Sequence, residues 1–298
     1  MNLKIGLIDV DSHNFPNLCL MKLSAYHKAA GDKVEWWRPF RRYDIVYKSR
    51  VFTDTYSKDE ITVRNAARVI KGGTGYGTDN ALPYDVEHTR PDYSLYPQFP
   101  GTAYGFLSRG CPRNCGFCIV SGKEGRKSVH TADLSEFWNG QRNIKLLDPN
   151  LFASREWRDL SEQLIESGAW IDFTQGCDIR LMTWEKIQYI KRMKMKRIHF
   201  AWDQYEDKGL IVPKLKMFRE LTGWDYRKMI VYVLTGYNTA IEQDLERIYI
   251  LRELGYNPYV MIYNKETLPP RHILRRMQRW VNNRFIFEAC RRFEDYTG

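Results

Sequence analysis

The fold is decided by residues 170–203, WIDFTQGCDIRLMTWEKIQYIKRMKMKRIHFAWD. Residues 170–177 and 197–203 are short apolar runs of the kind that form buried strands. Residues 183–195 lie between them, carry apolar side chains at helical spacing, and begin with Thr183, a favoured helix N-cap. A strand, a helix and a second strand in this order predict two parallel strands joined by a crossover helix.

The same alternation extends in both directions along the chain. Four more strands are predicted at residues 103–110, 143–150, 228–236 and 258–264. Further helices are predicted at residues 131–139, 154–168, 208–223 and 238–255. Six strands at roughly 27 residues per unit approach the spacing of an eightfold barrel. We therefore predict a partial (β/α)6 TIM-type barrel over residues 103–265, sealed by a helix at 270–295 within a C-terminal helical tail, 266–298.

A second, smaller domain is predicted before the barrel. Its expected strands are residues 3–10, 34–37, 44–52 and 67–75, and a helix follows the first strand and ends at Gly31. Strand–helix alternation indicates a small Rossmann-like N-terminal domain over residues 1–75. Residues 76–102 contain four prolines and no sustained periodicity, so they are predicted to be a linker.

Composition excludes several classes of protein. The chain has 298 residues, of which 43 % are hydrophobic, so wholesale disorder is not expected. No apolar run is long enough to cross a bilayer, and Asp9 and Asp11 interrupt any signal-peptide core, so we expect a cytoplasmic chain. The net charge of +10 gathers in residues 186–197 and in the arginines of the C-terminal tail. Such faces attract anions or nucleic acid, or are solvated helix surfaces.

Three of the six cysteines form a motif. In SRGCPRNCGFCIV, residues 108–120, Cys111, Cys115 and Cys118 have the spacing C-x3-C-x2-C. Three thiolates on one tight loop can hold three irons of a cubane cluster and leave the fourth iron without a protein ligand. The loop follows the first predicted barrel strand, at the end where barrel active sites are built. The alternatives are a zinc knuckle with His130 as the fourth ligand, or three structural thiols.

Residues 103–265 resemble the radical SAM superfamily in this loop and in the strand–helix units that follow it. The resemblance implies a [4Fe–4S] cluster on Cys111, Cys115 and Cys118, and S-adenosyl-L-methionine (SAM) bound to the open iron. It further implies reductive cleavage of SAM to methionine and a 5′-deoxyadenosyl radical that modifies an unidentified substrate. Phe117 matches the family's aromatic position near the adenine.

The resemblance also implies other SAM contacts. Asp148 would contact the methionyl amino group, or would cap a helix instead. The backbone of Thr235 and Gly236 would lie against adenine, or would form a plain turn. Four further residues end or follow the third and fourth predicted strands and would face the same barrel mouth: Gln175, Asp178, Arg180 and Asp203. Among them, Arg180 could pair with the SAM carboxylate. The alternative for all four is a structural salt bridge or a helix cap.

The other three cysteines, Cys19, Cys177 and Cys290, are isolated, which disfavours an auxiliary iron–sulfur domain. Small buried side chains are the ordinary role of such cysteines. Cys177 ends a strand at the predicted barrel mouth, so it is a weak candidate for a catalytic donor of a hydrogen atom or a proton.

The N-terminal domain is similar to a cobalamin-binding domain at residues 11–16, 49–51 and 72–73. Its His13 would be the cobalt ligand, but Pro16 replaces a glycine of that motif and the domain is short. We therefore expect a degenerate domain that shapes the substrate cleft, and cobalamin is unlikely as a cofactor. A cobalamin-dependent radical SAM methyltransferase remains the alternative enzyme, and a nucleic-acid-binding protein with a structural cluster is the alternative of another class.

The expected partners follow from the proposed chemistry. Reduction of a cluster requires a one-electron donor of the flavodoxin or ferredoxin type. The substrate is unidentified, and the basic charge favours an anionic molecule or a nucleic acid. No membrane partner is expected.

Overall fold

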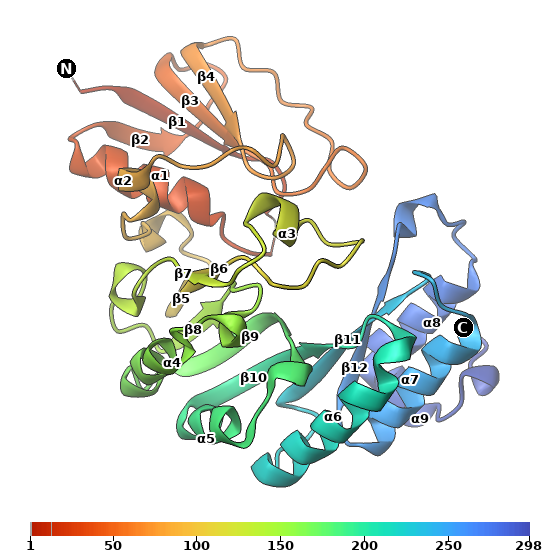
Figure 1. The fold of residues 1–298 in the computed structure, drawn as a ribbon. Coiled ribbons are helices and arrows are strands. Elements are labelled where there is room, and N and C mark those ends of the chain that lie inside the picture. Colours follow the sequence, from red (N-terminus) through yellow and green to blue (C-terminus); the bar gives the residue numbers. More distant parts are fainter. Residues whose placement is uncertain (1, 13) are drawn as a thin grey trace. The chain divides into compact units, whose positions relative to one another are not determined.

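The chain folds into two compact units in a computed structural model that describes residues 2–12 and 14–298. The first unit comprises Met1–Gly105 and Ala132–Gln141, and the second comprises Phe106–Thr131 and Arg142–Gly298. Each unit is built around a parallel sheet (Figure 1). None of the helices in the described part of the chain is long and apolar enough to cross a membrane.

The first unit contains a four-stranded parallel sheet in the order β2-β1-β3-β4. Its strands are β1 (Lys4–Asp9), β2 (Lys33–Trp36), β3 (Tyr43–Ser49) and β4 (Ala66–Gly72). The unit also contains α1 (Leu18–Ala29), α2 (Tyr84–Glu87), η1 (Tyr93–Leu95), β5 (Thr102–Gly105) and η2 (Leu134–Glu136). The four predicted strands and the first helix are thereby confirmed.

The central strand β1 explains why this sheet forms. Four consecutive residues of β1 are buried, because apolar side chains cover both faces of a central parallel strand. Ile5 and Leu7 pack with Leu20 of α1, and Ile8 packs with Val46 of β3. The helix starts where Asn17 accepts a hydrogen bond from the Leu20 amide and ends just before Gly31, whose φ of +84° suits a helix terminus.

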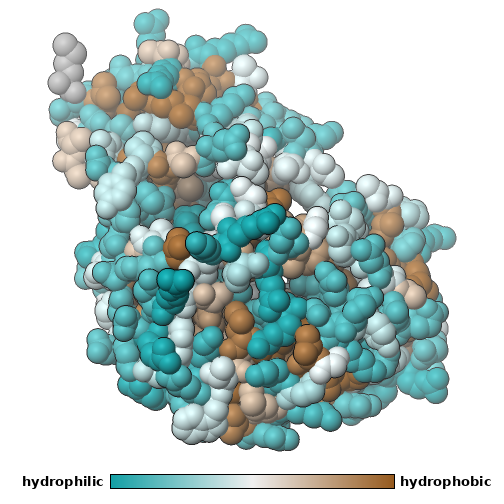
Figure 2. Space-filling model, viewed as in Figure 1, coloured by the Kyte–Doolittle hydropathy of each residue, from teal (hydrophilic) through white to brown (hydrophobic). Residues whose placement is uncertain are grey.

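The alternation expected of a Rossmann-like domain is only partly present. Among the described residues, α1 is the one helix that connects consecutive strands of this sheet. The 50–65 segment between β3 and β4 contains neither helix nor strand. Figure 2 shows apolar residues gathered over the strands of this sheet. Trp36 and Val69, which the strand register places on opposite faces, are 38 % and 39 % exposed. A single helix thus leaves part of the sheet surface uncovered.

The second unit contains five parallel strands in the order β12-β11-β10-β9-β8. These are β8 (Asn143–Leu146), β9 (Trp170–Cys177), β10 (Lys194–Ala201), β11 (Met229–Thr235) and β12 (Asn257–Ile262). The connecting helices are α4 (Trp157–Glu166), α5 (Trp184–Arg192), α6 (Lys208–Thr222) and α7 (Ile241–Glu253), which lie on one side of the sheet (Figure 1). Short helices η3 (Leu151–Ala153), η4 (Ile179–Leu181) and η5 (Tyr205–Asp207) follow β8, β9 and β10.

Side-chain alternation builds the core of this unit. Phe173, Phe200 and Val231 are almost fully buried, whereas Tyr259 on β12 is 45 % exposed. Because all five strands are parallel, their carboxyl ends meet at one edge of the sheet, called here the carboxyl edge. The second unit is therefore α/β with a parallel sheet, as predicted, and its description as a partial (β/α)6 barrel stays a prediction.

Two predicted elements at the start of the barrel are wrong in extent. The strand expected at residues 103–110 is divided into β5 (Thr102–Gly105) and β6 (Ser108–Arg109), and β6 pairs antiparallel with β7 (Val129–His130). The division arises because the amides of Leu107 and Ser108 donate to the Asp148 side chain and not to a neighbouring strand. The helix expected at 131–139 is only the short η2.

The predicted C-terminal helix at 270–295 is also wrong, since it is divided into three. These pieces are α8 (Ile273–Asn282), α9 (Arg284–Ala289) and η7 (Phe293–Asp295), preceded by η6 (Lys265–Thr267). Asn283 leaves helical geometry and caps α9 by accepting from the Ile286 amide. The expected sealing role is nevertheless visible: Trp280 is fully buried, and the Asn282 side chain bonds both the amide and the carbonyl of Val260 on edge strand β12.

Candidate functional site

The three clustered cysteines lie on a closed loop between β6 and β7. Pairing of Arg109 with Val129 brings the two ends of the loop together. Inside it, the Cys111 amide donates to the Gly125 carbonyl at 3.1 Å, and the Cys118 amide donates to the Cys115 carbonyl at 3.0 Å. The helix α3 (Val120–Lys123) follows directly. Backbone hydrogen bonds therefore fold this segment into the tight loop that the motif predicts.

Gly110 fixes where the loop leaves β6. Its φ is +85°, a left-handed conformation that residues with a Cβ rarely adopt. A Cβ built at this position would lie 2.2 Å from the Lys127 carbonyl oxygen. Glu124 reinforces the base of the loop by accepting from the Gly110 amide at 3.2 Å and from Arg109 at 3.3 Å. Only glycine is compatible with the close approach of residue 110 to the Lys127 carbonyl, where the first and last segments of the loop pass each other.

We expect Gly110→Ala to destabilise the loop, with Gly122→Ala as the matched control. The first change adds about 1–3 kcal/mol of backbone strain, besides the clash with the Lys127 carbonyl. A Cβ at Gly122, within α3, meets nothing within 4 Å, so this variant should be as stable as the parent or slightly more so. Urea denaturation of the purified chain measures both, and equal midpoints for Gly110→Ala and the parent would show that the crossing is not constrained.

The thiols of this loop affect one another electrostatically. Burial, the charge of Asp203 and the other two thiolates raise the pKa of Cys115. Burial, Cys111 and Asp203 likewise raise the pKa of Cys118. In residues 2–12 and 14–298, no three His, Cys, Asp or Glu side chains are arranged as ligands of one metal ion. In the part of the chain that the structure describes, the three thiols therefore share one loop and affect one another's charge without being arranged around one metal ion. The cluster, the zinc knuckle with His130 and the structural thiols all stay predictions.

Asp148 is held at the carboxyl edge by the start of the cysteine loop. Its carboxylate accepts hydrogen bonds from the Leu107 amide at 3.1 Å, the Ser108 amide at 2.5 Å and the Ser108 hydroxyl at 2.8 Å. Burial nevertheless raises the pKa of Asp148 to about 6. The alternative that Asp148 caps a helix is wrong, because Asn150 occupies the N-cap position of η3. Its predicted contact with SAM stays a prediction.

Asp178 and Arg180 form an ion-pair network after β9. Asp178 accepts from Arg113 of the cysteine loop at 2.6 Å and from the Arg180 side chain at 2.7 Å. Arg180 also pairs with Asp207 of η5. The structural salt bridges weighed for these residues are therefore present. Gln175, by contrast, is an exposed residue of β9.

Asp203 follows β10 at the same edge. Burial raises its pKa from the ordinary 3.8 to about 6, although the cations Arg247 and Arg180 act against this shift. The charge of Asp203 also acts on Cys115 and Cys118, which places it near the cysteine loop.

The raised pKa of Asp203 predicts a pH dependence of stability. Because the pKa of Asp203 is higher in the folded chain than in the unfolded chain, its protonated form stabilises the folded chain. This contribution is complete below pH 3.8 and is lost as the pH rises through about 6. We therefore expect the unfolding free energy of Asp203→Asn, relative to that of the parent, to rise by about 1–2 kcal/mol when the pH is raised from 4 to 7, allowing for partial solvent screening. Urea denaturation at both pH values tests this, and a pH-independent difference would contradict it.

Cys177 is the last residue of β9 and is buried. Burial, with the negative charges of Asp148 and Asp178, raises the pKa of its thiol well above the usual range. Cys177 therefore keeps its S–H proton at neutral pH. That protonation state is the one that a hydrogen-atom or proton donor requires.

The end of β11 reaches the cysteine loop through aromatic contacts. Phe117 packs edge-to-face against Tyr237 at 5.1 Å, and Tyr237 packs against Tyr263 at 4.9 Å. A Cβ at Gly116 would lie 2.6 Å from the Tyr237 hydroxyl. The hydroxyl of Thr235 donates to the Met261 carbonyl at 3.3 Å, so that side chain is used within the sheet. Gly236, at φ +73°, turns the chain toward Tyr237.

Several residues of this site have no role in the sequence prediction. Arg113 pairs with Asp178, Tyr237 contacts the loop, and Asn150 lies 3.6 Å from the Cys111 sulfur. Arg113 lies within the motif, and Asn150 lies two residues after Asp148 in the same turn. Proximity to the quoted motifs is therefore the signal that could have identified these two residues, whereas no comparable signal marks Tyr237.

Some side chains of the basic segments make contacts within the chain. Arg192 forms a bidentate pair with Glu162 at 2.7 Å, and Lys186 donates to the Phe152 carbonyl at 2.8 Å. In the C-terminal tail, Arg275 donates to the Lys265 carbonyl at 2.7 Å. The alternative of solvated or structural basic residues accounts for these side chains.

The positions of the N-terminal unit that resemble a cobalamin-binding motif form hydrogen bonds within the unit. The Asp11 carboxylate accepts from the amides of Val51 and Phe52 at 2.9 and 2.8 Å. The Asn17 amide donates to Ser49 at 2.9 Å. His13, the predicted cobalt ligand, lies outside the described residues. The structure thus supplies internal partners for the cobalamin-like positions that it describes.

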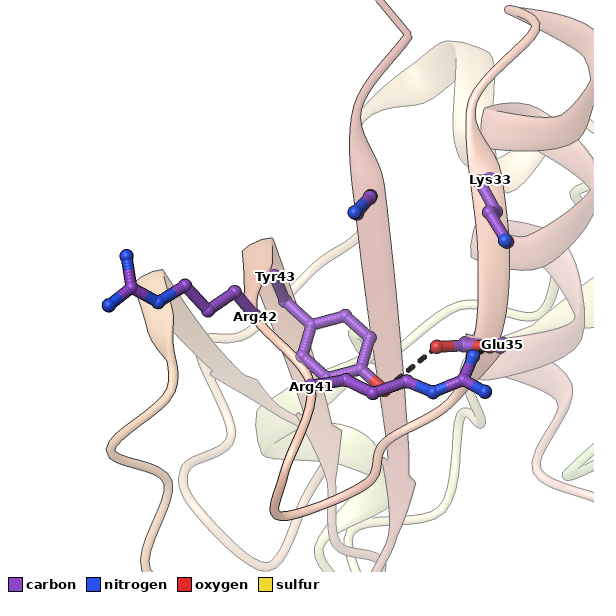
Figure 3. Close-up of a pocket in the computed structure, with 6 residues that line it drawn as sticks. Lys33, Glu35, Arg41, Arg42 and Tyr43 are labelled. Atoms are coloured by element: carbon purple, nitrogen blue, oxygen red, sulfur yellow. Dashed lines mark hydrogen bonds and ion pairs between the residues drawn. The ribbon is translucent and has the colours of Figure 1, made fainter.

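A cavity of about 320 Å³ lies elsewhere in the first unit (Figure 3). It is lined by Lys4, Lys33, Glu35, Arg41, Arg42 and Tyr43. Glu35 accepts from the Tyr43 hydroxyl at 3.0 Å and pairs with Arg41 at 2.7 Å, so its charge is compensated within the cavity wall. None of the predicted site residues lines this cavity.

No family model matches the chain, and no curated protein matches it. Among solved structures, the chain is similar to SuiB of Streptococcus suis bound to S-adenosylmethionine, at 14 % sequence identity and a TM-score of 0.46. The match covers 64 % of this chain and 48 % of SuiB, so the chain spans about half the length of that protein.

Proposed function

We propose that this protein is a radical SAM enzyme whose [4Fe–4S] cluster is held by Cys111, Cys115 and Cys118. One observation carries the proposal: the three cysteines lie on a single closed loop beside the carboxyl edge of a parallel sheet, and their charges act on one another. That edge is where enzymes built on parallel α/β sheets place their reacting groups.

The donor set fits a cluster. Thiolates are the soft ligands that iron–sulfur clusters use. Gathering thiolates in a partly buried loop is unfavourable without a cation, as the raised pKa values of Cys115 and Cys118 indicate. Binding of iron would remove this penalty. The absence of a Cβ at Gly116 lets Tyr237 approach the loop without a clash.

When bound, the cluster would supply the electron that cleaves the sulfonium of SAM to methionine and a 5′-deoxyadenosyl radical. The residues of the chain would bind and orient SAM. Asp148 would accept from its amino group, Phe117 and the backbone of Thr235 and Gly236 would contact the adenine, and Arg180 would pair with the carboxylate. Arg180 is held for this by Asp178 and Asp207, and Gln175 and Asp203 would complete the contacts.

Cys177 is the candidate donor to the substrate, because it keeps its proton at neutral pH. It would donate a hydrogen atom to the substrate radical and become a thiyl radical that the one-electron donor reduces, or it would donate a proton after that donor has reduced the substrate radical to an anion. The net charge of +10 supports an anionic substrate. A flavodoxin or ferredoxin would deliver the electron.

Anaerobic reconstitution tests the cluster assignment. We expect about four irons and four sulfides per chain and, after reduction, an electron paramagnetic resonance (EPR) signal that changes when SAM is added. Cys290→Ser, outside the loop, should retain both. One zinc and no labile sulfide would instead establish the zinc-knuckle alternative.

A further inference from the structure

Asn150 lies in the turn after β8 and reaches the cysteine loop. Its side-chain amide nitrogen is 3.6 Å from the sulfur of Cys111, within hydrogen-bonding range for sulfur. The residue is only 2 % exposed. The turn that carries it is fixed, because the Asp148 carboxylate is bonded to Leu107 and Ser108. The amide is therefore held against a cysteine that the sequence identifies as a ligand.

The turn itself does not require this side chain. The hydrogen bond that closes η3 uses the backbone carbonyl of Asn150, which accepts from the Ala153 amide at 3.1 Å. The side-chain oxygen Oδ1 is buried and has no hydrogen-bond partner among the described residues. Burying an amide with an unpartnered oxygen is unfavourable. A role at the sulfur accounts for an amide at this position, whereas a structural role in the turn does not.

We propose that Asn150 is a positioning residue that donates an N–H···S hydrogen bond to Cys111 and thereby raises the reduction potential of the cluster. The inference rests on the proposed function. A thiolate accepts hydrogen bonds, so the amide orientation that points N–H toward the sulfur is the favourable one. A donor stabilises negative charge on the sulfur, and this charge is larger after the cluster is reduced. The hydrogen bond therefore favours the reduced state.

The test is an anaerobic redox titration of the reconstituted protein, followed by EPR. Asn150→Leu removes the donor and keeps a similar volume. Asn150→Asp keeps the shape but offers no N–H at neutral pH. We expect both to shift the reduction equilibrium about tenfold toward the oxidised cluster, which is about 59 mV for one electron. Asn114→Ala, on the same loop but exposed and bonded to Ser121, is the matched control and should leave the potential unchanged.

The outcomes separate this inference from the proposed function. Failure of the parent protein to bind iron and sulfide would overturn the proposed function and this inference with it. A parent cluster with the same potential in Asn150→Leu and Asn150→Asp would overturn the inference alone. If Asn150→Leu fails to fold, an unchanged potential in Asn150→Asp overturns the inference by itself, because the lost donor and the added negative charge would both favour the oxidised cluster.

Discussion

Serine in place of Cys115 should leave the protein unable to retain its cluster or to cleave SAM. Loss of one of three protein ligands should lower 5′-deoxyadenosine formation by more than about 100-fold, because changes even beyond the ligands of a metal commonly cost 10–100-fold. The fold should survive, since Cys115 is only partly buried and lies on a loop. Iron analysis and chromatography of the reaction mixture give the two measurements.

The control for this variant is Cys290→Ser in the C-terminal tail. The Cys290 thiol donates to the Arg292 carbonyl at 3.1 Å, a contact that a serine hydroxyl can replace. Iron content and turnover should equal those of the parent. Turnover by Cys115→Ser at the parent rate would mean that Cys115 is not a ligand.

The second large effect is expected for Asp148→Ala. The substitution leaves two buried backbone amides and the Ser108 hydroxyl without their acceptor and opens a cavity. We expect a loss of about 3–4 kcal/mol of unfolding free energy, together with weaker iron retention because β6 anchors the cysteine loop. Urea denaturation followed by circular dichroism measures the first effect.

Asp159→Ala is the matched control for that loss. Asp159 is exposed in the first turn of α4, where a carboxylate is worth no more than about 1 kcal/mol. A similar destabilisation of both variants would refute the anchoring role of Asp148.

Elements with an uninterrupted local pattern could be predicted from sequence. Strand β9 spans the predicted residues 170–177, because a short apolar run begins there and Gly168, at positive φ, lies just after the preceding helix. Helix α7 lies within the predicted residues 238–255, and Thr183 caps α5 as expected. The predicted helix at 183–195 is too long, however, because α5 ends at Arg192 and β10 begins at Lys194. In these elements local propensity and tertiary packing favour the same structure.

Elements that depend on distant polar contacts could not be predicted. Residues 103–110 are of types that favour a strand throughout. The strand is nevertheless interrupted, because the amides of Leu107 and Ser108 donate hydrogen bonds to the Asp148 carboxylate, some 40 residues away. The C-terminal run has helical spacing throughout, but Asn283 ends one helix and caps the next. A sequence pattern reports which faces are apolar and does not report which side chain will accept a backbone amide.

The candidate site shows the same division. The cysteine spacing is local and visible in the sequence, and the structure places Phe117 against the end of β11. Asn150 and Tyr237 lie on other elements, so only the folded chain brings them to the loop, and Arg113 is a loop residue whose partner Asp178 lies after β9. For Arg180, the sequence leaves two roles open, a pair with the SAM carboxylate and a structural salt bridge. The salt bridge with Asp178 is present in the structure, and the pair with SAM stays a prediction.

Formation of 5′-deoxyadenosine tests the central claim most directly. The anaerobically reconstituted protein would be reduced with dithionite in the presence of SAM, and the products separated by chromatography. We expect 5′-deoxyadenosine and methionine in equal amounts, dependent on reductant and absent with Cys115→Ser. A protein that holds about four irons per chain yet releases no 5′-deoxyadenosine would contradict the claim.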